Sequence, residues 1–115
     1  MNRKPHLDEE ALAELRDVME DEFDILIQTY ISDSRDRLEA LRQALSDGDP
    51  DALAKAAHSF KGSSINIGAP RLGELCQIIE QAGRDGDLDT GRQSMDALEA
   101  EFATVRRLME EALLA

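Results

Sequence analysis

The sequence predicts an all-α protein, an antiparallel four-helix bundle with an additional short helix at its N-terminal end. Apolar residues recur at steps of three and four, no segment alternates as a strand does, and Gly- and Pro-containing turns divide the chain into helix-length segments. A chain of 115 residues suffices for one core. We therefore expect a tail over residues 1–7 and one domain over residues 8–115.

The first two helices are expected before residue 47. Asp8 is a residue type that caps helix N-termini, and the apolar stripe of a short helix follows it. That stripe is Ala11, Leu12, Leu15, Val18 and Met19. A second helix is expected over about residues 20–46, with a stripe that Ser34 interrupts. Its members are Phe23, Leu26, Ile27, Tyr30, Leu38, Leu41 and Leu45.

Three more helices are expected after the turn that contains Gly48 and Pro50. The third spans about residues 50–67, Gly68 and Pro70 separate it from the fourth, and residues 83–89 form the turn before the last. Their inward faces are Leu53, Ala56, Ala57, Phe60, Ser64 and Ile67; Leu72, Leu75, Cys76, Ile79 and Ala82; and Met95, Leu98, Phe102, Val105, Met109 and Ala112. Short turns between amphipathic helices predict an antiparallel bundle, with the first helix packed against one end.

The charge balance argues against two classes of partner. The chain has 13 basic and 25 acidic residues, a formal net charge of −12, and this field repels nucleic acid and anionic membrane surfaces. No apolar run approaches the roughly 20 residues of a membrane span, and the N-terminus lacks the apolar stretch of a secretory signal. Cys76 is the sole cysteine, which is compatible with a reducing compartment. We expect a cytoplasmic monomer.

His58 lies on the wrong face of the third helix to be part of the core. At about 100° per residue, the stripe centres near Leu53 and Phe60, and His58 falls roughly 150° away. Gly62 lies one turn further along the same outer face, with Lys61 three residues after His58. Gly inside a helix costs about 1 kcal/mol relative to Ala, so its presence indicates that a second backbone or a phosphate approaches closely.

These three residues have the chemistry of a phosphoryl acceptor. Neutral imidazole is a nucleophile near pH 7, and a neighbouring ammonium stabilises the negative charge of a transferred phosphoryl group. One alternative is a helical adaptor that binds a signalling partner independently of phosphorylation, in which the surface position of His58 is incidental. Another is a metal-binding bundle enzyme, which needs inward-facing Glu-x-x-His pairs, but neither His6 nor His58 has Glu three residues before it.

The segment Ala57-His58-Ser59-Phe60-Lys61-Gly62-Ser63-Ser64 resembles the signature of histidine-containing phosphotransfer (HPt) domains. The resemblance continues through Gly68, Ala69, Leu72, Leu75, Cys76 and Glu80. It covers about residues 50–86 by motif and nearly the whole chain by helix layout. Phe60 departs from the pattern, since the family more often has Leu there, and we expect altered packing at this point.

The resemblance implies a role for four residues of this segment. His58 would carry a phosphoryl group on Nε2, and Lys61 would neutralise it. Gly62 would leave room for the partner, and Gly68 would permit a tight joint between two helices.

Three further residues are candidates for the site. Glu80, 22 residues after His58, stands where the family places a Gln or Glu that hydrogen-bonds the imidazole; a solvated helix carboxylate is the alternative. Arg84, 26 residues after His58, stands where a basic residue contacts the phosphate or partner; complementing the helix dipole is the alternative. Ile65 points outward about two turns along the face of His58. It either supplies an apolar contact to a docked partner or is a singly exposed aliphatic residue without such a role.

The mechanism that the resemblance implies is relay. The receiver-domain aspartyl phosphate of a hybrid histidine kinase would donate to His58, and the receiver domain of a response regulator would take the group. Mg²⁺ would be bound by the receiver, so we expect no cofactor and no metal in this chain. The segment Gly83-Arg84-Asp85-Gly86-Asp87 lacks the Lys and spacing of a nucleotide loop, so no ATP-dependent autokinase activity is expected. The length and helix complement of the chain indicate a stand-alone protein, and the resemblance is to the bacterial type of the family.

Overall fold

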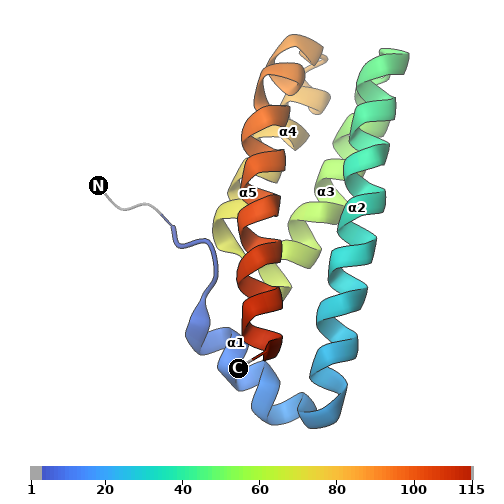
Figure 1. Cartoon of the computed structure of the whole chain (residues 1–115). Helices are drawn as coiled ribbons and strands as arrows, with labels where there is room; N and C mark the ends of the chain where they lie inside the picture. Colours follow the sequence, from blue (N-terminus) through green and yellow to red (C-terminus); the bar gives the residue numbers. More distant parts are fainter. Residues whose placement is uncertain (1–3, 115) are drawn as a thin grey trace.

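The computed structural model describes residues 4–114, and within them the chain is all-α (Figure 1). Four long helices run side by side in alternating directions, and a short helix lies across one end of them. The elements are α1 (Glu9–Met19), the 3₁₀ turn η1 (Glu20–Glu22), α2 (Phe23–Asp47), α3 (Pro50–Ile67), α4 (Pro70–Arg84) and α5 (Leu88–Leu114). The predicted four-helix bundle with an additional N-terminal helix is confirmed.

The helix boundaries follow from the capping residues that the sequence offers. Asp8 and Asp49 each accept a hydrogen bond from the backbone N–H three residues on, at the start of α1 and of α3. Gly48 and Gly68 end α2 and α3 with φ of 67° and 90°, in the left-handed region that glycine adopts without a steric penalty. The limits predicted for the third helix therefore coincide with α3.

Two expectations for the N-terminal third are wrong. The second helix begins at Phe23 because residues 20–22 form η1, where Glu20 has φ of 50° and breaks the helical path. Val18, expected in the core, is 79% exposed. The short α1 buries only a narrow face, of which Leu12 is the buried member, and Val18 lies to one side of it.

Residues 4–7 are bound to the bundle, although they were expected to be part of a tail. Leu7 is buried, and the backbone N–H of Asp8 donates to the carbonyl of Gly68 at 2.7 Å. The Nδ1 atom of His6 lies within hydrogen-bonding distance of Glu101 on α5. Residues 1–3 and 115 of the expected tail and domain lie outside the described residues.

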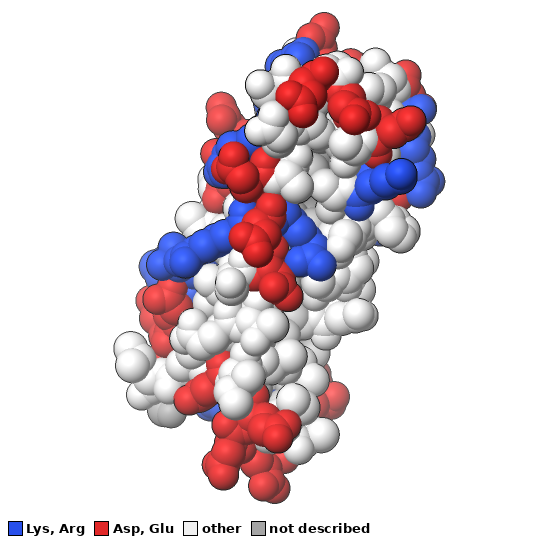
Figure 2. Space-filling view, turned by 90° about the vertical axis from the view of Figure 1, so that its right-hand side faces the viewer, with Lys and Arg blue, Asp and Glu red and all other residues white. Residues whose placement is uncertain are grey.

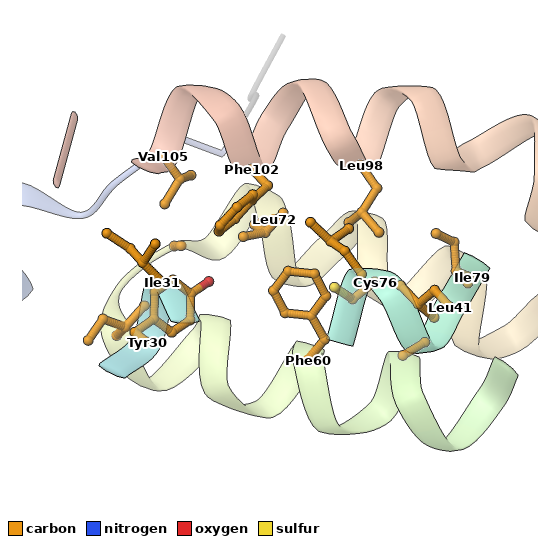
Figure 3. Packing of buried hydrophobic residues seen from close by; sticks show 14 of the residues in the cluster. Tyr30, Ile31, Leu41, Phe60, Leu72, Cys76, Ile79, Leu98, Phe102 and Val105 are labelled. Carbon is orange, nitrogen blue, oxygen red and sulfur yellow. The ribbon is translucent and has the colours of Figure 1, made fainter. Parts of the chain in front are cut away.

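The core is filled from all four long helices (Figure 3). Phe60 of α3 is fully buried and packs against Phe102 of α5 in an edge-to-face arrangement, with ring centroids 6.2 Å apart at 70°. Phe60 stands where the family more often has Leu, and the altered packing expected there involves this aromatic pair. Ser34, which interrupts the stripe of α2, is also buried, and close to it the hydroxyl groups of Tyr30 and Ser64 hydrogen-bond at 2.7 Å.

The segment that contains α1 and η1 is strongly acidic. Nine Asp and Glu residues and a single Arg lie between residues 8 and 24. Figure 2 shows acidic side chains gathered at the lower end, where η1 joins α1 to α2. Within residues 4–114, no helix combines the length and apolar character that a bilayer span requires.

Gly83 brings the backbones of α3 and α4 into close contact. A Cβ atom at Gly83 would lie 2.7 Å from the N atom of Ala54 and 2.8 Å from the O atom of Pro50. Gly83 was expected in a turn, but α4 continues to Arg84 and includes it. This contact sets a short distance between the backbones of α3 and α4, so side chains of α4 can reach the outer face of α3.

Gly83→Ala is expected to lower the free energy of unfolding by about 1–3 kcal/mol, because the added methyl group meets backbone atoms that cannot rotate away. Gly62→Ala is the matched control. A Cβ at Gly62 meets nothing within 4 Å, so the better helix propensity of Ala should raise stability by up to about 1 kcal/mol. Urea unfolding followed by circular dichroism measures both variants, and equal stabilities would refute the close contact at Gly83.

Candidate functional site

His58 projects from the middle of α3 into solvent. Its side chain is 65% exposed, while the neighbouring Ala57 and Phe60 are fully buried. The outward direction follows from the helical phase, since the core stripe of α3 occupies the opposite side of the helix. An imidazole in this place is accessible to another molecule.

Beneath His58 lies the buried carboxylate of Glu80, which α4 contributes. Glu80 is 1% exposed, and its Oε2 atom lies 3.0 Å from Nδ1 of His58. A carboxylate can only accept a hydrogen bond, so Nδ1 carries the proton and donates it. The other ring nitrogen, Nε2, keeps its lone pair and is left without a partner from Glu80.

The same carboxylate binds two cations. The Nζ atom of Lys61 lies 2.7 Å from Oε1 of Glu80, and the Nη2 atom of Arg84 lies 2.6 Å from Oε2. Arg84 is one helical turn after Glu80 on α4, and Lys61 is nearly one turn after His58 on α3. All four candidate side chains from the two helices therefore meet at one point.

The environment of Glu80 keeps this group ionised. Burial by itself raises the pKa of the carboxyl group, but the hydrogen bonds from Lys61 and His58, together with the charges of Lys61 and Arg84, outweigh it. The net result is a pKa below the ordinary value of a glutamate. Glu80 is therefore a negatively charged hydrogen-bond acceptor at neutral pH, and the alternative of a solvated helix carboxylate does not describe it.

Two of the other three candidates are near His58 and one is not. Gly62 is exposed, and the space above it is open. Ile65 is 56% exposed, although its Cγ1 atom lies over Gly73 of α4. Gly68 lies at the joint between α3 and α4, where the backbone of Asp8 covers it, so its place is structural.

Two neighbours of the site were not anticipated. The Oε1 atom of Gln77 on α4 accepts a hydrogen bond from Nζ of Lys61 at 2.7 Å. Arg37 of α2 donates from Nε to Oγ of Ser59 at 2.9 Å, which brings a third helix beside His58. The spacing of Gln77 from Glu80 on one side of α4 was the only available signal for the first contact, and no pattern in α2 indicates the second.

Cys76 is a buried thiol of α4 that lies near Glu80 and Lys61. Burial raises the pKa of the Cys76 thiol to about 12, and the charge of Glu80 acts in the same direction while Lys61 opposes it. The thiol is therefore unreactive at neutral pH. Across residues 4–114, no three His, Cys, Asp or Glu side chains are grouped to hold a metal ion.

The fold and the site together define a class of protein: a helical bundle that presents one nucleophilic imidazole, backed by a buried carboxylate and flanked by two cations. No deep pocket is needed for such an imidazole to react, because a second macromolecule can supply the rest of the reaction chamber.

The comparisons with known proteins agree with this class. The family model described as Hpt domain matches residues 25–108. Histidine-containing phosphotransfer protein 4 of Arabidopsis thaliana is 31% identical over 110 residues, which cover 91% of this chain and 87% of the relative. The crystal structure of histidine-containing phosphotransfer protein B of Pseudomonas aeruginosa PAO1 superposes with a TM-score of 0.91 at 44% identity, covering 96% of each chain.

A plant structure, histidine-containing phosphotransfer protein MtHPt2 of Medicago truncatula, shares the fold, with a TM-score of 0.75 at 21% identity over 94% of this chain and 81% of the other. This chain belongs to the Hpt domain family. Its role is that of a phosphorelay intermediate, a carrier of phosphoryl groups between other proteins.

Glu80→Gln tests the charged state of the buried acceptor. Because folding lowers the pKa of Glu80, its stabilising effect is fully present above the ordinary glutamate pKa of about 4.3 and is lost as pH falls through the lower folded value. The wild type should exceed Glu80→Gln in unfolding free energy by roughly 1.5–3 kcal/mol at pH 7, and this difference should shrink below about pH 4. Urea unfolding at pH 3, 5 and 7 measures it, and a difference that stays constant would contradict an ionised Glu80.

Proposed function

We propose that His58 is the phosphoryl acceptor of this relay intermediate, and that the group arrives from the aspartyl phosphate of a receiver domain on a hybrid histidine kinase. The receiver domain of a response regulator then takes the group from His58. The observation that carries the proposal is the hydrogen bond between Nδ1 of His58 and Glu80, which leaves the lone pair on the exposed nitrogen Nε2.

In the first step, Nε2 of His58 attacks the phosphorus atom of the aspartyl phosphate. The N–P bond forms, the P–O bond to the aspartate breaks, and its electron pair returns to that carboxylate. The proton stays on Nδ1, where the charge of Glu80 stabilises the phosphoimidazolium ion. The onward step reverses these bond changes with the aspartate of the second receiver as the nucleophile.

Lys61 and Arg84 supply the positive charge that the phosphoryl group needs. Both cations contact the carboxylate of Glu80, which also accepts the hydrogen bond from Nδ1 of His58. Charge spread over the phosphoryl oxygens in the transition state is stabilised by such groups. Mg²⁺, the metal of this chemistry, is assigned to the receiver domain, so this chain needs no metal and no cofactor of its own.

The surface around His58 is proposed as the docking site for both receivers. Gly62 leaves open space beside the imidazole, and Ile65 offers an exposed apolar side chain further along α3. We assign Gly68 to shaping the α3–α4 joint and not to docking. The net charge of −12 argues against nucleic acid and membrane surfaces as further partners.

We propose that the chain on its own has no ATP-dependent autokinase activity, because the segment Gly83-Arg84-Asp85-Gly86-Asp87 lacks the Lys and the spacing of a nucleotide-binding loop. We further propose that it acts as a cytoplasmic monomer, with Cys76 as a free buried thiol. Incubation with ATP and Mg²⁺ in the absence of other proteins should therefore give no phosphoprotein.

Transfer from a radiolabelled receiver domain tests the acceptor. Wild type should gain label that is labile to acid and stable to base, and His58→Gln should gain none while its circular dichroism spectrum is unchanged. A His58→Gln variant that takes label equally from the receiver would overturn the assignment. A wild type that takes no label from several phosphorylated receivers would favour the adaptor, which binds a signalling partner independently of phosphorylation.

Gly62→Gln should block transfer through bulk, because the new side chain fills the open space beside His58. We expect a fall in the transfer rate of at least about 100-fold with helicity intact. Ala103→Gln is the matched control, since it adds the same side chain at an exposed position of α5, and its rate should equal that of the wild type. Normal transfer by Gly62→Gln would show that the receiver does not approach α3 closely.

A further inference from the structure

The structure contains a second histidine–carboxylate pair, far from His58 in the sequence. The Nδ1 atom of His6 lies 2.7 Å from Oε2 and 3.0 Å from Oε1 of Glu101. His6 belongs to the segment before α1, and Glu101 is on α5 with only 5% of its side chain exposed. The two groups are 95 residues apart, so only the tertiary fold brings them together.

This pair repeats the arrangement at His58. Within residues 4–114, Glu80 and Glu101 are the only buried carboxylates, and each of them accepts from Nδ1 of a different histidine. An arginine also lies beside each carboxylate. The Nε atom of Arg71 is 3.5 Å from Oε1 of Glu101, as Arg84 is beside Glu80. A buried carboxylate with a guanidinium partner thus fixes the ring of each histidine.

The hydrogen bond to Glu101 involves Nδ1 of His6 and leaves Nε2 without a partner from that carboxylate. Glu101 faces the Nδ1 edge of the ring and can only accept, so Nδ1 holds the proton and Nε2 holds the lone pair. The side chain of His6 is 40% exposed, while that of Glu101 is 5% exposed. Lys4, two residues before His6, forms an ion pair with Glu74 of α4 at 3.4 Å, which ties the segment before α1 to the bundle.

We propose that His6 is a second phosphoryl acceptor, open to small phosphoryl donors of the phosphoramidate class and not to receiver domains. Nε2 attacks the phosphorus atom, the N–P bond to His6 forms, and the P–N bond of the donor breaks. The donor nitrogen takes a proton from solvent and leaves as ammonia, while Nδ1 keeps its proton against Glu101.

Access explains why small donors suit this site. His6 is less exposed than His58, at 40% against 65%. Pro5 and Leu7 flank His6, whereas Gly62 leaves open space one helical turn after His58. The segment also lies against the bundle, held by the burial of Leu7. A domain-sized donor meets these obstacles, and a molecule of a few atoms does not. The proposal does not depend on the phosphorelay partners of His58.

Potassium phosphoramidate is the probe, and the folded full-length chain is the substrate. Peptide mapping by mass spectrometry under basic conditions should find phosphate on both His6 and His58 of the wild type. His58→Gln should keep the label on His6. Glu101→Gln should slow labelling of His6 by about tenfold or more, because the neutral amide stabilises the phosphoimidazolium less well.

His58 in the same Glu101→Gln protein is the internal control, and its labelling rate should not change. A second comparison does not need that variant to fold: His6 in the native His58→Gln chain should react about tenfold faster than in the same chain unfolded in urea. Labelling of His6 at the same rate in both states would overturn the proposal, since any free histidine reacts slowly with this reagent. Absence of label on His6 in the native chain would overturn it as well.

Discussion

The buried carboxylate of Glu80 is the group on which the site depends. An ionised carboxylate without partners is costly to bury, and Glu80 is stabilised by a hydrogen bond from His58 and by the charges of Lys61 and Arg84. The same contacts orient the imidazole, select its tautomer and gather two cations beside it. A single side chain on α4 therefore turns an exposed histidine on α3 into a nucleophile with a defined reactive atom.

This interaction requires α3 and α4 to approach closely, which links the chemistry to the packing of the bundle. Gly83 has no Cβ atom, and a Cβ at this position would lie 2.7 Å from the backbone N atom of Ala54. Glu80 lies one turn earlier on the same helix, so its carboxylate reaches beneath the outer face of α3. Packing of Phe60 against Phe102 holds α3 from the other side and keeps His58 outside.

The helices and the outward direction of His58 could be predicted from the sequence, because both follow from local periodicity and capping residues. Contacts between helices could not. The burial of Glu80 and its bond to Lys61 depend on the distance between α3 and α4, and the hydrogen bond of Gln77 depends on the rotamer of Lys61. The exposure of Val18 was missed because periodicity shows which residues share a face but not how wide the buried face is.

NMR of the His58 ring nitrogens, before and after phosphorylation by a receiver domain, tests the central claim most directly. Long-range ¹H–¹⁵N correlation should find the neutral ring with its proton on Nδ1, and ³¹P coupling in the phosphorylated protein should appear at Nε2. This result would show that Glu80 selects the reactive nitrogen. A neutral ring with its proton on Nε2, or phosphorus bound to Nδ1, would contradict the account.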